Sequence, residues 1–159
     1  MIDKNYIDVF RKIYSHLNDS TINWAVTGSF SFALQGIDIV PNDIDLQTDK
    51  IGAYSIENLF RDYVTKKVKF SSTEKIRSHF GKLSIDGIKV EIMGDIQKRL
   101  EDGSWEDPVD LLRYKKIIES LGMKVPVLSI EYEYKAYFKL GRVDKADILW
   151  NWIKDNHED

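Results

Sequence analysis

The stretch from Ile22 to Thr48 decides the fold expected for this chain. It begins Ile-Asn-Trp-Ala-Val-Thr-Gly-Ser, continues for thirteen residues and ends Asp-Ile-Asp-Leu-Gln-Thr. The short apolar run before Gly28 predicts a buried strand, and Gly28 interrupts it. Ser29 is a suitable N-cap for the short helix that follows. The stretch therefore predicts a strand, a glycine-serine turn, a helix and a second strand.

The second strand carries a pair of acids. Polar and apolar residues alternate from residue 43 to residue 48, which places Asp43 and Asp45 on the same face of a strand. Two residue rises, or ~7 Å, separate their positions along the strand. That separation suits a pair of hard cations about 4 Å apart, as in two-metal phosphoryl transfer. Mg²⁺ fits such a site because it combines a few carboxylate oxygens with water and substrate phosphate.

A third acid lies on a later strand-like run. Lys89, Glu91 and Met93 alternate with apolar residues, so Glu91 on a neighbouring strand would act as a metal ligand, as the base for an attacking hydroxyl, or as both. Without a cation the three acids would repel one another. Gly28 lets the backbone approach a phosphate closely, and Ser29 adds a hydroxyl at a helix start with free N–H groups. Together these residues predict a site for a metal-bound nucleoside triphosphate.

The remaining pattern predicts one α+β domain over residues 1–159, with a catalytic α/β core over 1–98 and a loop with C-terminal helices over 99–159. We expect a mixed β-sheet of about five strands flanked by helices, with a C-terminal helical pair. Asp86-Gly87 predicts a hairpin turn. Further strands are expected over 66–70, 79–85 and 88–93, helices over 5–17, 52–63, 129–140 and about 142–155, and mostly irregular chain over 94–128.

Composition narrows the functional classes. No apolar run approaches the ~20 residues that cross a bilayer, and no signal-peptide core is present, so a cytoplasmic location is expected. The net charge of −3 argues against an extended nucleic-acid surface. The chain has no cysteine, which excludes thiolate zinc sites and cysteine nucleophiles.

Val26-Thr27-Gly28-Ser29, followed by Asp43-Ile44-Asp45-Leu46, resembles the signature of the polymerase-beta-type nucleotidyltransferase superfamily. Glu91 in Lys-Val-Glu-Ile matches its strand-borne third carboxylate. The chain is most similar to small bacterial members, which include antibiotic nucleotidyltransferases and abortive-infection toxins. Asn42 departs from the pattern, because many relatives carry His or Arg there.

The resemblance implies transfer of a nucleoside monophosphate from an NTP such as ATP to a hydroxyl of a small molecule or protein, with two Mg²⁺ ions. It assigns catalysis and metal binding to Asp43, Asp45 and Glu91. It assigns nucleotide binding to Gly28, Ser29 and Lys139. An alternative is an antitoxin or regulatory binding partner with the same fold, which is non-catalytic or modifies a partner toxin.

Other polar residues leave alternatives open. Lys139 and Arg142 lie near the junction of the last two helices, where they would meet a triphosphate or form structural ion pairs. The acidic stretch 101–107 would attract a cationic acceptor to the face of Trp105, or it is a solvated loop with Trp105 against the core. Glu131 and Glu133 form a second acidic pair, but on a helix such residues diverge, and both are expected at the surface.

Overall fold

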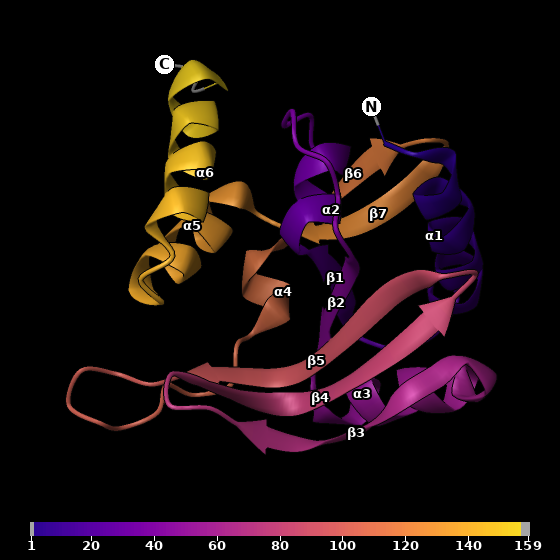
Figure 1. The fold of residues 1–159 in the computed structure, drawn as a ribbon, viewed down its shortest axis with the longest axis horizontal. Helices are drawn as coiled ribbons and strands as arrows, with labels where there is room; N and C mark the ends of the chain where they lie inside the picture. Colours follow the sequence, from indigo (N-terminus) through magenta and orange to yellow (C-terminus); the bar gives the residue numbers. More distant parts are fainter. Residues whose placement is uncertain (1, 157–159) are drawn as a thin grey trace.

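A computed structural model of the chain describes residues 2–156 and confirms the α+β class (Figure 1). Within these residues the helices are α1 (Lys4–Leu17), α2 (Gly28–Leu34), α3 (Lys50–Leu59), the 3-10 turn η1 (Arg61–Tyr63), α4 (Leu111–Tyr114), α5 (Ile130–Lys139) and α6 (Val143–Asn156). The strands are β1 (Trp24–Thr27), β2 (Ile44–Thr48), β3 (Val64–Ser72), β4 (Ile76–Ile85), β5 (Ile88–Lys98), β6 (Lys115–Ser120) and β7 (Met123–Leu128).

The strands form one mixed sheet in the order β3-β4-β5-β2-β1-β7-β6. β2 pairs parallel with β5, and β1 pairs parallel with β7, while the other neighbours are antiparallel. β4 and β5 join at the predicted Asp86-Gly87 turn, where both residues have positive φ. The expected strands around the acids are therefore confirmed, together with the helical pair α5–α6 at the C-terminal end (Figure 1).

The expectation of irregular chain over 94–128 is wrong. β5 continues to Lys98, and β6 and β7 form a hairpin that raises the sheet from about five strands to seven. The hairpin turns at Leu121-Gly122, with φ of 55° and 77°. Two-residue hairpin turns of this kind usually have Asn or Asp before the glycine. Leu121 stands in that position here, so the sequence did not indicate a turn.

One face of the sheet carries the main core, which we call the core face. α1 packs there because its apolar residues Phe10, Ile13 and Leu17 recur at helical spacing and are buried. The same core includes Ile92 of β5 and the α3 residue Ala53. No helix within the described residues is long and apolar enough to cross a membrane. The opposite face is covered over β1 and β7 by α4 and α5 and holds the predicted acids.

Candidate active site

The sheet register brings the predicted residues side by side. Thr27 of β1 is the partner of Asp45 on β2, and Asp45 is the partner of Glu91 on β5. Because side chains directly opposite one another point to the same side of a sheet, these three residues share one face. We call it the catalytic face. Strand order and register alone therefore create the convergence that the sequence pattern predicted.

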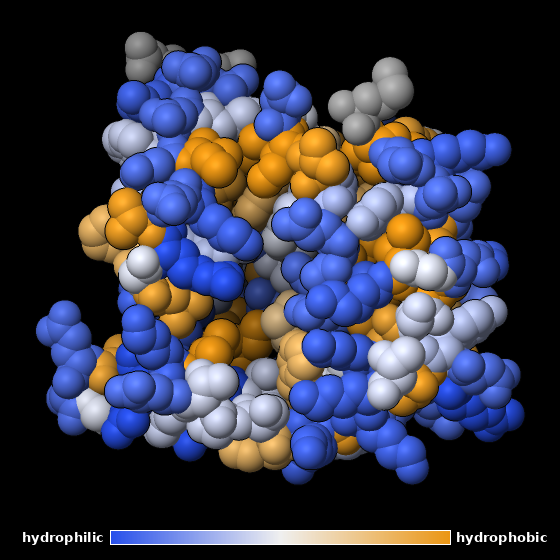
Figure 2. Space-filling model, in the orientation of Figure 1, coloured by the Kyte–Doolittle hydropathy of each residue, from blue (hydrophilic) through white to orange (hydrophobic). Residues whose placement is uncertain are grey.

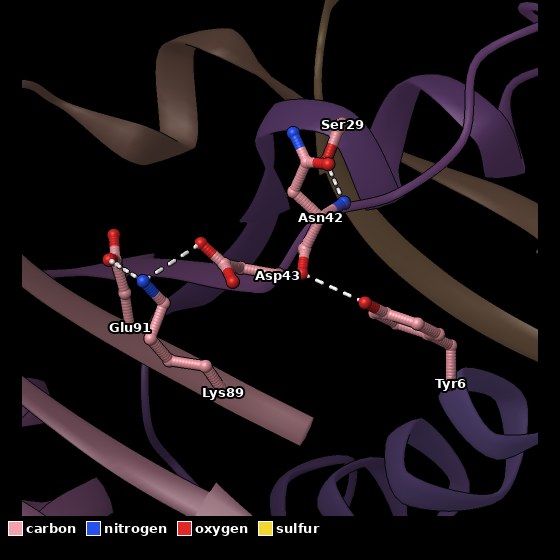
Figure 3. Close-up of polar contacts among 6 residues, drawn as sticks. All are labelled: Tyr6, Ser29, Asn42, Asp43, Lys89 and Glu91. Carbon is pink, nitrogen blue, oxygen red and sulfur yellow. Dashed lines mark hydrogen bonds and ion pairs between the residues drawn. The ribbon is translucent and has the colours of Figure 1, made fainter. Parts of the chain in front are cut away.

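Asp43, Asp45 and Glu91, which we call the triad, offer carboxylate oxygens that all lie within 4.8 Å of one another. Asp43 stands one residue before β2. The ammonium group of Lys89 lies between two of them, with Nζ 3.4 Å from Asp43 Oδ2 and 3.5 Å from Glu91 Oε1 (Figure 3). Lys89 therefore supplies part of the positive charge that three adjacent carboxylates require.

The pKa of Asp45 is strongly perturbed. Burial, followed by the charges of Glu91 and Asp43, raises the pKa of Asp45 to about 7. Its Oδ1 atom is shielded from solvent and has no hydrogen-bond partner. A buried carboxylate oxygen without a partner, beside two more carboxylates, is the kind of donor set that Mg²⁺ takes. The residues present therefore fit a divalent metal site.

Gly28 and Asp45 pack against each other so closely that no side chain fits between them. Gly28 has a φ of 74°, and a Cβ atom placed on it would lie 2.5 Å from Asp45 Oδ2. Glycine is therefore required here both for its backbone conformation and for the space that the Asp45 carboxylate occupies.

Ser29 holds the chain segment that leads into the triad. Its Oγ accepts a hydrogen bond of 3.0 Å from the backbone N–H of Asn42. The carbonyl of Asn42 in turn accepts a bond of 2.8 Å from the hydroxyl of Tyr6 on α1 (Figure 3). The position that departs from the superfamily pattern thus contributes its backbone to positioning Asp43.

The expectation that Glu131 and Glu133 both lie at the surface is wrong for Glu133. Glu131 is exposed, but Glu133 is buried with 3% of its surface accessible. Its Oε1 accepts hydrogen bonds from the Thr27 hydroxyl and from the Gly28 N–H, the latter at 3.0 Å. Glu133 therefore fastens α5 to the glycine turn of the site, a contact that the sequence interpretation missed.

Burial dominates the electrostatics of Glu133. It raises the pKa of this carboxyl to about 8, against the opposing effect of the bonds from Thr27 and Gly28. The second oxygen, Oε2, is buried without a partner. A group in this state is largely protonated at neutral pH, so it anchors the turn without adding a full negative charge beside Asp45.

A cavity of about 170 Å³ lies beneath α5 on the catalytic face. Asp45, Glu91 and Gly28 line one part of it, and Tyr137 and Arg142 line the part contributed by the C-terminal helices. Figure 2 shows the molecule hollowed between the α5–α6 pair and the strands β1 and β2, with apolar side chains inside and hydrophilic ones around the rim. The triad therefore opens into a recess whose lining combines polar side chains with apolar ones such as Met93 and Ile96.

The family of the chain follows from its sequence. A model of the family described as aminoglycoside-2''-adenylyltransferase matches residues 9–149. The chain belongs to this family. No protein with a curated description is similar enough in sequence to count as a relative.

A solved structure is similar to this chain over nearly its whole length. A protein from Thermotoga maritima, provisionally assigned as a nucleotidyltransferase, is 63% identical over 98% of this chain and 97% of that chain, with a TM-score of 0.87.

Two distant structures share the fold. The lincosamide antibiotic adenylyltransferase LnuA, bound to lincomycin, has 11% identity over 91% of this chain and 98% of that chain, with a TM-score of 0.53. ANT(2'')-Ia, in complex with adenylyl-2''-tobramycin, has 10% identity over 94% of this chain and 90% of that chain, with a TM-score of 0.57. The chain therefore has the fold of a small nucleotidyltransferase.

Lys139 and Arg142, the two basic residues near the junction of α5 and α6, line different cavities. Arg142 lines the triad cavity, whereas Lys139 lines a neighbouring cavity of about 760 Å³. Lys139 Nζ lies 3.6 Å from Glu106 Oε2. Lys145 of α6 is a further cation near the site, because its charge lowers the pKa of Asp45 against the larger effect of burial. Of the two predicted cations, only Arg142 shares the cavity of the triad.

Trp105 does not offer a free aromatic face. The guanidinium of Arg77 lies 4.5 Å from the centre of its ring, and that of Arg99 lies 5.8 Å away. Trp105 is half-buried and forms a β-bridge with Arg99. Arg99 also donates a hydrogen bond of 3.1 Å to the carbonyl of Gly103 within the acidic stretch.

Proposed function

We propose that this chain is a Mg²⁺-dependent nucleotidyltransferase that moves the adenylyl group of ATP to a hydroxyl of a small acceptor. The convergence of the triad beside the Gly28 turn is the observation that carries the proposal. Membership of an adenylyltransferase family supports ATP as the donor. The buried, unpartnered Oδ1 of Asp45 supports the metal requirement.

Asp43, Asp45 and Glu91 would hold two Mg²⁺ ions. When bound, these ions would neutralise charge on the triphosphate and on the attacking oxygen. The N–H groups that follow Gly28 would face the phosphates, and Ser29 would keep Asp43 in place through Asn42. Arg142 would reach the triphosphate from the helical junction. Lys139, which was expected in that role, would first have to leave Glu106.

Glu91 would accept the proton of the acceptor hydroxyl. The acceptor oxygen then forms a bond to the α-phosphorus, and the bond from that phosphorus to the bridging oxygen breaks, releasing pyrophosphate. Glu91 suits this role because it lies on β5, on the side of Asp45 away from the Gly28 turn.

The test is incubation with α-labelled ATP and Mg²⁺ against panels of hydroxyl compounds, with pyrophosphate release as a second readout. The expected result is metal-dependent label on one class of acceptor, and loss of both signals in Asp45→Asn. The same signals at wild-type level in Asp45→Asn would refute the assignment of the site. A non-catalytic regulatory partner is not favoured, because such a protein gains nothing from three converging carboxylates.

A further inference from the structure

The register of the sheet defines the side from which an acceptor would approach. This inference rests on the proposed function, in which the triphosphate lies at Gly28 on β1. The attacking and leaving oxygens of a phosphoryl transfer lie roughly in line. The acceptor therefore approaches from the side opposite Gly28. Beyond Asp45 on β2 and Glu91 on β5, that side is formed by β4 and β3.

Lysines cover this side of the catalytic face. Lys82 on β4 is the direct partner of Glu91, and Lys66 on β3 is the direct partner of Lys82. Both ammonium groups lie near the ring of Phe80, whose centre is 5.3 Å from Lys66 Nζ and 5.8 Å from Lys82 Nζ. Lys89 completes the group beside Glu91. We call Lys66, Lys82, Lys89 and Phe80 the lysine face.

The lysine face is open to solvent. Lys66 and Lys89 are exposed, and Lys82 and Phe80 are half-buried. The helix α3 covers these strands on the core face, where its Ala53 lies against Gly94. Residues 61–82 contain seven Lys or Arg side chains and only two acids. Of these, Lys66 and Lys82 are placed by the register on the same face as Glu91, so two ammonium groups lie on its acceptor side.

A cationic acceptor does not suit this arrangement. An aminoglycoside would bring several ammonium groups against the lysine face, where like charges repel. The acidic stretch that would attract it surrounds Trp105, whose ring is already in contact with Arg77 and Arg99. An extended nucleic acid does not suit it either, because the chain has a net charge of −3 and the lysine face spans only three strands.

We propose that the acceptor is a small phosphorylated alcohol whose phosphate is bound by Lys66 and Lys82 and whose hydroxyl is placed at Glu91. Neighbouring strands lie about 4.8 Å apart, so roughly 5 to 10 Å separate Glu91 from the two lysines across the sheet. That span matches the distance between a hydroxyl and a phosphate at opposite ends of a sugar phosphate. Phe80 holds the two ammonium groups in position before the ligand arrives.

Lys66 also has a plain structural role, because a lysine on an edge strand discourages pairing with another sheet. Lys116 has the same role on β6 at the far edge of the sheet and is equally exposed. Lys116→Ala is therefore the matched control for changes in the lysine face. It removes one edge-strand ammonium group without touching the acceptor side.

The experiment offers the protein α-labelled ATP, Mg²⁺ and three acceptor panels. These are sugar phosphates such as glucose 6-phosphate and ribose 5-phosphate, the corresponding sugars, and tobramycin with a short oligoribonucleotide. We expect label on a sugar phosphate and not on its dephosphorylated counterpart. Lys66→Ala/Lys82→Ala should raise the KM for that sugar phosphate by at least about tenfold and leave the KM for ATP unchanged, since charge-assisted bonds to phosphate are lost. Lys116→Ala should stay within twofold of wild type.

Transfer to tobramycin, to the oligoribonucleotide or to unphosphorylated sugars alone would overturn the acceptor assignment while leaving the nucleotidyltransferase in place. An unchanged KM for the sugar phosphate in the double variant would overturn it as well. Failure of the proposed function has a different signature, which is the absence of Mg²⁺-dependent ATP binding by calorimetry together with no pyrophosphate release for any acceptor.

Discussion

Replacing Gly28 by alanine tests whether this position matters more for the activity of the site than for the stability of the fold. The backbone at Gly28 has a φ of 74°, and a Cβ atom there would lie 2.5 Å from Asp45 Oδ2, whereas Cβ contacts shorter than 3.0 Å are essentially never seen. The carboxylate must therefore move by at least about 0.5 Å, which is the tolerance of a catalytic constellation. Because Asp45 Oδ2 ends a side chain that can rotate, the clash itself should cost the fold little.

Gly36→Ala is the matched control. Gly36 also has a positive φ, of 98°, but nothing lies within 4 Å of the added Cβ. Both variants should lose about 1 to 2 kcal/mol of unfolding free energy from left-handed backbone strain. Only Gly28→Ala should lose about 100-fold in kcat/KM, as expected for a displaced catalytic group.

Urea denaturation measures the stability of both variants, and pyrophosphate release with titration of Mn²⁺ measures the site. Wild-type metal affinity and turnover in Gly28→Ala would refute the contact with Asp45. An equal loss of activity in Gly36→Ala would attribute the effect to backbone strain alone.

Three further changes test other parts of the site. Asp45→Asn should abolish transfer but leave the metal-free protein at least as stable as wild type at pH 8. Burial raises the pKa of Asp45 to about 7, so the ionised carboxylate destabilises the metal-free fold at that pH. A large loss of stability, measured by circular dichroism, would contradict this. Burial also raises the pKa of Glu133 to about 8. Between pH ~4.3 and about 8 the unfolded chain has therefore released a proton that the folded chain keeps. As the pH rises through this range, the unfolding free energy of the wild type should fall by up to about 1.4 kcal/mol per pH unit. Glu133→Gln should lose that part of the fall in urea titrations from pH 5 to 9, and parallel curves would show that Glu133 ionises normally. Lys89→Met removes the ammonium group between Asp43 and Glu91, so calorimetry should show tighter Mn²⁺ binding, and weaker binding would show that Lys89 does not compete with the metal.

The catalytic face was predictable because its signals are local. In a strand, every second side chain points to the same face of the sheet. This period placed Asp43 and Asp45 on one face of their strand and predicted the same face for Glu91 on a neighbouring strand. The Asp86-Gly87 turn identified the hairpin that delivers Glu91. These features need no knowledge of distant residues.

The missed features depend on partners far along the chain. The rule that an acid on an amphipathic helix faces solvent failed for Glu133, because its partners are the Thr27 hydroxyl and the Gly28 N–H, 106 and 105 residues away. Lys139 was expected at the triphosphate, but its ion pair with Glu106 depends on how the 99–110 segment turns back beside the end of β5. No local pattern encodes either contact.

The contact between Glu133 and the glycine turn also sets an order for events during synthesis. The triad and the turn lie within the first 98 residues of the chain, but β7, which pairs with β1, and Glu133, which fastens the turn, come later. Since a ribosome adds residues from the N-terminus at about 5–20 per second, a nascent chain carries all three acids for several seconds before their surroundings can be completed. A partly made or truncated molecule would thus have the acids without the finished site.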